Sequence, residues 1–301
     1  GKSRTKAPEN VEEPVFINIK TDFGFKKIFG NKALLIAFLN AILNKDIVEI
    51  EYLPTEQLGY IRENRKAVYD VYCTTTNGEQ FIVEMQASPQ LYLIERILFY
   101  MGYPVINQAP KGKVTITNNE GKQIEVPWNY SISGIYMICI LDGIIFPEEE
   151  AKDIVVEQMK ILRQRANKVF TDKWQVVTIE LPKFNKTENE LKTVEDKWLY
   201  SFKNMEKLPK CPKNLNENIF NELYENARII NLTKREMKAY SKSVLEYDDV
   251  ILAVERGRIE GENKERIKIV RNCYKNGISI EQIAKITGVA KQEVTAILTK
   301  S

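Results

Sequence analysis

The sequence predicts an α/β protein in which a mixed β-sheet is flanked by helices. Three observations lead to this prediction. Two segments rich in β-forming residues flank Asn77-Gly78 and indicate a hairpin. The continuous apolar run 132–141 is typical of a buried central strand. Apolar-rich helical patterns occupy 32–43 and begin again near Leu91, so strands and helices share one chain.

The first elements along the chain are predicted to be helices. Thr21 has the side chain of an N-cap residue, and Asp22 places an acid in the first turn of the helix that follows. The next helix, 32–43, is expected to end at Asn44, and 47–53 suggests a short strand. Two helices therefore precede the first strand.

The hairpin around Gly78 can be assigned a register. A two-residue Asn-Gly loop would leave Asp70 on the opposite face from Glu84 and Gln86, because side chains alternate along a strand. A three-residue loop, 76–78, with Gly78 in a left-handed conformation, gives the other register. Asp70 then lies directly across from Glu84, with Gln86 on the same face. We prefer this register, because two adjacent carboxylates repel each other unless a hard divalent cation lies between them.

The elements after the hairpin alternate between helix and strand. A helix from about Leu91 carries Arg96 and Tyr100 on one face, and Pro104 is expected to bend or end it. The remaining predictions are a second hairpin over 111–126, an amphipathic piece over 153–168, a strand over 174–181 and helical segments over 191–255.

The C-terminal tail has helix-turn-helix proportions. A charged helix over 256–275 is followed by Gly277, a suitable stop. Residues 279–282 form a capping box that opens a second helix, and 287–289 turn into a third over 290–298. DNA contact and a helical hairpin for packing or self-association explain this pattern equally well.

Composition excludes several classes of enzyme. The chain has no histidine, which removes Ser-His-Asp and Cys-His hydrolases, imidazole zinc sites and HUH- or HNH-type nucleases. No glycine-rich phosphate loop occurs, so no nucleotide cofactor is expected. Hydrolysis would then depend on carboxylate-bound magnesium or manganese.

Charge and cysteine usage bound the partners and the compartment. The net charge is only +3, so any DNA-binding charge must be local. The four cysteines are widely separated and form no CxxC, as expected for reduced thiols of a cytoplasmic protein. No apolar run approaches the ~20 residues of a membrane span, so no membrane partner is expected.

The acidic hairpin and the segment upstream of it resemble a known nuclease superfamily. Asp70, followed by Glu84-X-Gln86 on the next strand and preceded by residues 21–30, resembles the PD-(D/E)XK nucleases. The closer resemblance is to the branch of recombination-promoting nucleases and PD-(D/E)XK nuclease family transposases. It spans most of residues 15–260. The other matching segments are 35–43, 95–100 and 130–141.

The resemblance implies a restriction-endonuclease-like fold and a metal-dependent DNA endonuclease with a role in recombination or mobile-element DNA. It implies that Asp70 and Glu84 bind Mg²⁺ (or Mn²⁺) and that Gln86 positions the attacking water. Gln86 stands where most of the superfamily has lysine, and because glutamine is neutral we expect slow or conditional cleavage. The alternative for Asp70 is a strand-edge carboxylate paired with Arg62 or Arg65.

Four more residues are weaker candidates for the site. Asp22 is a candidate for an additional acid from the first helix, although stabilisation by the helix dipole explains it equally well. Lys26 is a candidate phosphate contact, or a solvated helix lysine. The resemblance places Arg96 and Tyr100 where the fold sets a phosphate-neutralising or site-supporting side chain; packing is the alternative.

We predict a disordered leader over 1–14, a nuclease core over 15–190, a helical extension over 191–256, and a charged helix with the helix-turn-helix-like tail over 257–301. The resemblance further implies DNA as partner and a possible homodimer. Two alternatives stay open. One is a catalytically weak or inactive nuclease-fold protein that binds DNA or a regulatory partner, and the other is an RNA nuclease.

Overall fold

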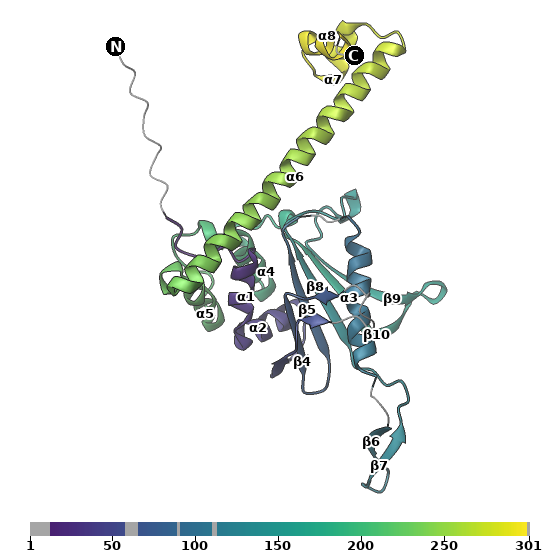
Figure 1. Ribbon diagram of the computed structural model, residues 1–301, viewed down its shortest axis with the longest axis vertical. Helices are drawn as coiled ribbons and strands as arrows, with labels where there is room; N and C mark the ends of the chain where they lie inside the picture. Colours follow the sequence, from purple (N-terminus) through teal and green to yellow (C-terminus); the bar gives the residue numbers. More distant parts are fainter. Residues whose placement is uncertain (1–12, 58–65, 89–90, 110–112, 300–301) are drawn as a thin grey trace. The chain divides into compact units, whose positions relative to one another are not determined.

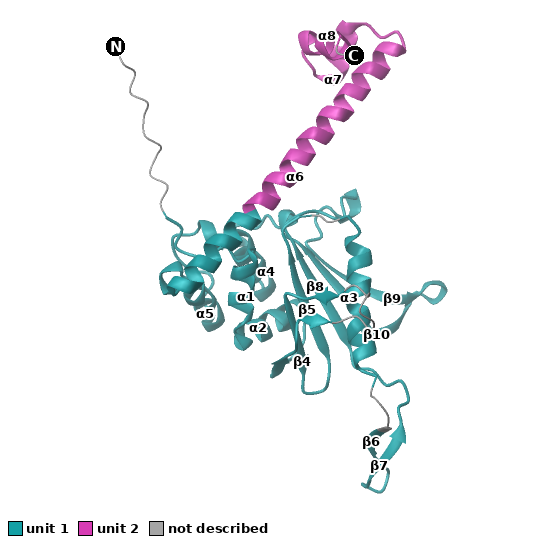
Figure 2. Ribbon diagram, viewed as in Figure 1, with its two compact units in different colours: residues 1–247 teal, residues 248–301 magenta. Residues whose placement is uncertain are grey.

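The computed structural model describes residues 13–57, 66–88, 91–109 and 113–299 (Figure 1). The chain divides into two compact units, residues 1–247 and 248–301 (Figure 2). Most of the predicted leader, together with Arg62 and Arg65, lies outside the described residues. No helix in the described ranges is long and apolar enough to cross a membrane.

The first unit is built on a six-stranded mixed sheet with strand order β1-β4-β5-β8-β10-β9 (Figure 1). Strands β5, β8 and β10 are parallel to one another, and the other neighbours are antiparallel. All residues of β8 are buried, which confirms the predicted central strand. The strands are β1 Ile50–Tyr52, β4 Val71–Thr75, β5 Gln80–Gln86, β8 Ile135–Leu141, β9 Val156–Arg163 and β10 Lys168–Glu180.

Two small sheets lie outside the main one. The predicted second hairpin is confirmed as β6 with β7, paired in antiparallel fashion around the turn at Gly121. A shorter pair, β2 with β3, precedes the central hairpin. These strands are β2 Glu56–Gln57, β3 Ala67–Val68, β6 Lys113–Thr117 and β7 Gln123–Pro127.

The register of the β4–β5 hairpin is the predicted one. Val71 pairs with Val83, and the N–H of Thr75 donates to the carbonyl of Glu79 at 2.9 Å, so three residues form the loop. Gly78 adopts a φ of +81°, the left-handed conformation that this loop requires.

One face of the sheet is covered by α1, α2, α4 and α5. The predicted N-cap of α1 is confirmed, because the Thr21 hydroxyl accepts from the N–H of Gly24 at 3.0 Å. Large aromatic side chains fill the space between these helices, with the rings of Phe38 and Trp198 5.5 Å apart in edge-to-face contact. Each such fully buried side chain contributes about 1.5–3 kcal/mol. The helices are α1 Asp22–Phe29, α2 Lys32–Leu43, α4 Val194–Asn204 and α5 Asn218–Asn226.

The opposite face is covered by α3, Leu93–Asn107, through buried residues such as Ile97 and Met101. The helix does not end at Pro104 but continues to Asn107. Proline has no N–H to donate to the carbonyl four residues earlier, that of Tyr100. The hydroxyl of Tyr69 donates to that carbonyl at 2.9 Å and replaces the missing bond. This contact explains why the helix tolerates the proline.

The last helices are α6 Lys234–Lys275, α7 Ile280–Thr287 and α8 Lys291–Thr299, and the unit boundary falls within α6. In the second unit, the predicted capping box at Ser279 and Gln282 is confirmed. Gly277 and Gly288 have positive φ, which suits turns after helices. A small core of Val270, Ile283, Val289 and Val294 holds this unit together. Single turns of 3₁₀ helix are η1 Glu149–Ala151, η2 Gln164–Ala166, η3 Leu181–Lys183, η4 Glu188–Glu190, η5 Met205–Lys207 and η6 Ile229–Asn231.

Candidate metal centre

The structure brings Asp70 and Glu84 together at the open end of the β4–β5 hairpin. Asp70 lies in the bend just before β4, and Glu84 is near the end of β5. The N–H of Asp70 donates to Glu84 Oε1 at 3.0 Å, and the N–H of Met85 donates to Asp70 Oδ2 at 2.9 Å. Each carboxylate is therefore oriented by the backbone of the other strand.

Both carboxylates are costly to ionise where they stand. Glu84 is only 2% exposed. Burial and the neighbouring charge of Asp70 raise the pKa of Glu84. Burial also raises the pKa of Asp70, although the Met85 N–H and the charge of Lys26 act in the other direction. Two such groups side by side favour a cation between them.

Gln86 and Arg96 continue the site beyond the carboxylates. The Gln86 amide donates to Glu84 Oε2 at 3.4 Å, and Arg96 donates to Gln86 Oε1 at 3.4 Å. A terminal nitrogen of Arg96 is 3.7 Å from Glu84 Oε2. The guanidinium lies 4.8 Å from the centre of the Tyr100 ring. The predicted residues of β5 and α3 thus form one connected group.

Asp22 and Lys26 lie on α1 and are bonded to each other, with 2.6 Å between Lys26 Nζ and Asp22 Oδ1. Both act on the site through their charge, since Lys26 lowers and Asp22 raises the pKa of Asp70. Among the described residues no group of three or more carboxylates or thiolates is arranged to hold a metal. A direct role for Asp22 or Lys26 stays a prediction.

Asp142 and Lys20 are neighbours of the site that sequence reasoning missed. The N–H of Asp142 donates to the carbonyl of Gln86 at 2.9 Å, and Lys20 Nζ is 2.9 Å from Asp142 Oδ2. The hydroxyl of Tyr247 donates to the same carboxylate. The sequence places Asp142 directly after the buried central strand, but its contact with Gln86 depends on β5 and β8 being parallel neighbours.

The donor set at Asp70 and Glu84 fits a hard divalent cation. Mg²⁺ is commonly held by one or two carboxylates and completes its shell with waters and substrate phosphates. Two carboxylates, one buried and one half-buried, match that pattern. Burial raises both pKa values, and the charge of Asp70 adds to the shift at Glu84; a cation there would favour the ionised form of both groups.

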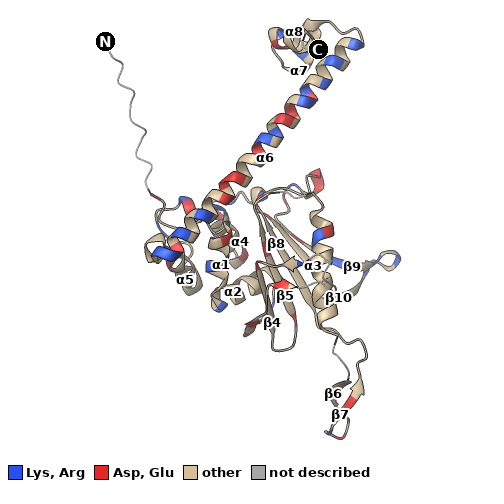
Figure 3. Cartoon of the chain, in the orientation of Figure 1, with Lys and Arg blue, Asp and Glu red and all other residues tan. Residues whose placement is uncertain are grey.

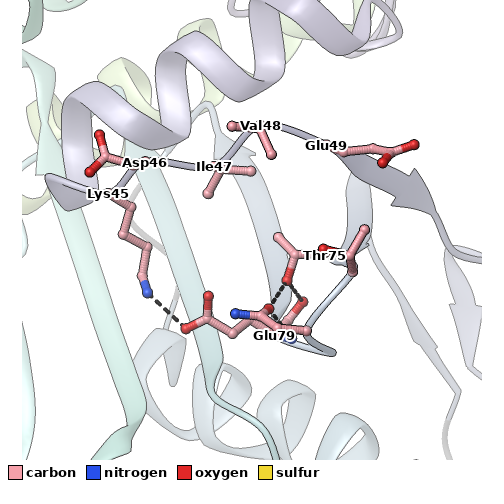
Figure 4. A pocket seen from close by; sticks show the side chains of 9 residues that line it. Lys45, Asp46, Ile47, Val48, Glu49, Thr75 and Glu79 are labelled. Atoms are coloured by element: carbon pink, nitrogen blue, oxygen red, sulfur yellow. Dashed lines mark hydrogen bonds and ion pairs between the residues drawn. The ribbon is translucent and has the colours of Figure 1, made fainter.

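The other end of the same hairpin is different. A cavity of about 190 Å³ lies beside the turn, between residues 45–49 and 75–79 (Figure 4). Lys45 Nζ is 2.7 Å from Glu79 Oε1, and the Tyr136 hydroxyl donates to the same oxygen at 2.9 Å. Partial burial acts against them, but these bonds hold the pKa of Glu79 below its usual value. The carboxylate at this end already has its partners.

Residues 19–257 match the sequence model of the PD-(D/E)XK nuclease family transposases. The chain belongs to this family. No curated protein and no solved structure matches the chain. Membership supports a nuclease and mobile-element role, and PD-(D/E)XK nucleases generally use divalent metal ions. The mixed sheet with helices on both faces agrees with the fold of this family.

Proposed function

We propose that this family member is a metal-dependent DNA endonuclease in which Asp70 and Glu84 hold Mg²⁺ (or Mn²⁺). The observation that carries the proposal is the pair of carboxylates at one end of the hairpin, with Glu84 almost fully buried beside Asp70. Glu79, by contrast, has a lysine at 2.7 Å. Among the residues that the structure describes, the cation nearest to Glu84 is Arg96, at 3.7 Å.

Bound metal would supply an activated water and neutralise charge on the phosphate. Gln86 can orient a water or bond a phosphate oxygen through its amide, but it carries no charge. Arg96 is the cation that accompanies Glu84 and Gln86, and we assign it the role of facing the charge that develops on the phosphate. A neutral residue at position 86 is the reason we propose slow cleavage.

We further propose that the substrate belongs to recombination or mobile-element DNA. Family membership supports this proposal. The described part of the chain contains one such pair of carboxylates, so cutting both strands of a duplex would need two successive cuts or two copies. A homodimer is the assembly we propose, and sedimentation of the protein with and without DNA tests it.

The function is tested by incubating the full chain with supercoiled DNA and with structured RNA, in Mg²⁺, Mn²⁺, Ca²⁺ or EDTA. We expect DNA cleavage with Mg²⁺ or Mn²⁺ and none with EDTA. Asp70→Asn should lower the rate more than about 100-fold, because loss of outer-shell partners alone costs about 10–100-fold. Cleavage that persists in Asp70→Asn contradicts the assigned site.

Two outcomes would favour the alternatives. Cleavage of RNA with intact DNA would indicate an RNA nuclease. DNA binding without any metal binding in calorimetry would indicate a non-catalytic DNA-binding protein. Calorimetry of Asp70→Asn, whose side chain keeps its shape and loses its charge, shows whether the metal binds at this pair.

A further inference from the structure

A second cavity, of about 270 Å³, lies between α3 and the strands β9 and β10. Its walls are almost entirely apolar and include Ile97 and Leu98 of α3, Trp174 and Val176 of β10, and Phe146. Leu98 is 53% exposed, so this wall is open to solvent. Apolar cavities with a few polar groups are typical of ligand sites.

The polar group of interest in this cavity is the hydroxyl of Thr178. The residue is 1% exposed, and its Oγ1 is buried without a hydrogen-bond partner. A buried hydroxyl without a partner is unfavourable, and such groups call for an explanation. The cavity beside Glu79 offers the contrast, since its lysine and glutamate are bonded to each other (Figure 4). Thr178 lines the cavity, and a ligand bound there would give its hydroxyl a partner.

The cavity lies in line with the candidate metal centre. Glu84 pairs with Cys139 on β8, and Cys139 pairs with Thr178 on β10. Residues paired in this way point to the same face of a sheet, and neighbouring strands are about 4.8 Å apart. Thr178 is consequently about 10 Å from Glu84 on the face that α3 covers. A nucleotide next to the cleaved phosphate can reach it.

The hairpin of β9 and β10 carries a local concentration of basic residues. Because the net charge of the chain is only +3, a DNA-binding surface would need such a local concentration. The segment 160–173 contains five basic residues and one acidic residue, a net charge of +4, against +3 for the whole chain. Its tip is coloured mainly by Lys and Arg in Figure 3. Arg163, Arg165 and Lys168 are exposed, as is the ring of Phe170 at 68%. Basic side chains interleaved with an aromatic one are typical of surfaces that bind nucleic acid.

The wall formed by Phe146 is held in place by a buried ion pair. Glu180 accepts from the N–H groups of Ile145 and Phe146, and it pairs with Lys183. Lys183 donates to the carbonyls of Phe146 and Ala151, each at 2.8 Å. Both side chains of the pair are at most 3% exposed. These bonds hold the backbone at Phe146 in place on one side of the cavity.

We propose that this cavity receives an unstacked base of the DNA strand being cut, while the phosphates of that strand lie on the 160–173 hairpin. This inference rests on the proposed nuclease function and adds the part of the substrate that is recognised. The flat apolar faces of a base suit walls such as Trp174 and Ile97, and its polar edge can bond the Thr178 hydroxyl. Because a hydroxyl can donate or accept, this bond would hold a base without selecting which one.

The test measures binding of short single-stranded DNA, with Ca²⁺ in place of Mg²⁺, to the full chain. One set of strands carries a single abasic residue at each successive position along the strand. We expect one or two positions at which the abasic residue weakens binding at least about 5-fold. Thr178→Val should weaken binding of the intact strand about 3- to 10-fold, and it should have no effect on the strand that lacks the base at that position.

Two further variants separate ligand binding from folding. Leu98→Trp fills the cavity from an exposed position and should weaken binding as the abasic residue does. Thr115→Val, an exposed threonine on β6, is the matched control and should bind normally. The melting temperature of Thr178→Val should stay the same or rise, because the variant removes an unpaired hydroxyl.

The outcomes distinguish this inference from the proposed function. Cleavage of DNA with equal binding of intact and abasic strands overturns the base site and leaves the nuclease standing. An abasic effect that Thr178→Val removes, in a protein that cuts nothing, keeps the base site and rejects the nuclease. The same position-dependent effect with RNA strands alone overturns DNA as the occupant. A Thr178→Val effect that is equal for intact and abasic strands also overturns the proposal.

Discussion

Glu79 and Glu84 lie five residues apart at the two ends of one hairpin strand, and their surroundings act on them in opposite ways. Hydrogen bonds from Lys45 and Tyr136 lower the pKa of Glu79, despite its partial burial. Burial and the charge of Asp70 raise the pKa of Glu84. The comparison shows that the groups beside a carboxylate, more than its place along the hairpin, decide whether its pKa is lowered or raised.

The largest difference between the two ends should appear in catalysis. Glu84→Gln keeps the shape of the side chain but removes the charge that we propose binds the metal, so we expect the rate of DNA cleavage to fall more than about 100-fold. Glu79→Gln makes the same chemical change at the other end and should stay within about 3-fold of the wild type, as expected for a substitution away from the site. A plasmid-nicking assay with Mg²⁺ measures both. Equal losses in the two variants would contradict the assignment of the site.

The next effect concerns the neutral residue beside Glu84. Gln86→Lys adds a positive charge near the position of the phosphate, and we expect it to raise kcat about 10-fold if transition-state charge limits the rate. Gln86→Leu, which keeps the size of the side chain and removes its hydrogen bonds, should lower kcat. Single-turnover cleavage measures this change. Gln86→Lys and Gln86→Leu variants that are both slower than the wild type, by similar factors, would show that the amide itself is needed.

The two ends should also differ in how pH changes stability in the absence of metal. A carboxyl whose pKa is raised by folding makes the free energy of unfolding fall as pH rises above its ordinary value, about 4.3 for glutamate. Each unit of the shift is worth about 1.4 kcal/mol. We therefore expect the protein in EDTA to lose stability between about pH 4.3 and neutral pH. Glu84→Gln should remove much of that loss.

Glu79 should contribute with the opposite sign. Its lowered pKa stabilises the fold above the ordinary value, and this contribution is lost as pH falls through the lowered pKa. Urea unfolding of the wild type, Glu84→Gln and Glu79→Gln across this pH range measures both effects. The same pH slope in all three proteins would count against the opposite surroundings of the two glutamates.

The smallest expected effect is structural and lies at the turn. Lys45→Met leaves Glu79 with the Tyr136 hydroxyl but without its ion pair, which should cost about 1 kcal/mol of unfolding free energy. DNA cleavage at saturating Mg²⁺ should be unchanged. A large loss of cleavage in Lys45→Met would mean that the turn end communicates with the metal centre.

Local chemistry is sufficient to predict the hairpin and the carboxylate pair. Asn77-Gly78 allows a two-residue or a three-residue loop, and the choice between them depends on placing the two carboxylates on one face around a cation; the loop length then fixes which residues share a face. Asp70 and Glu84 can therefore be placed side by side from the amino-acid sequence alone. The position of Gln86 beside Glu84 follows from the same alternation along β5.

Contacts between segments far apart in the chain could not be predicted. Asp142 reaches Gln86 only because β5 and β8 are parallel neighbours, which no local pattern shows. The sequence predicts an amphipathic piece over 153–168 and does not predict a hairpin there. In the structure, residues 160–173 form the paired ends of β9 and β10. The missing hydrogen-bond partner of the Thr178 hydroxyl depends on which residues pack around it, and these contacts cannot be read from the sequence.

Pro104 has a consequence for how the site holds its geometry. By leaving the carbonyl of Tyr100 without a helical donor, the proline makes that carbonyl available to the hydroxyl of Tyr69. Tyr69 is the residue before Asp70, and Tyr100 is one turn from Arg96 on α3. This bond ties the residue next to Asp70, a proposed metal ligand, to the helix that carries Arg96, so the packing of α3 helps to set where Asp70 lies.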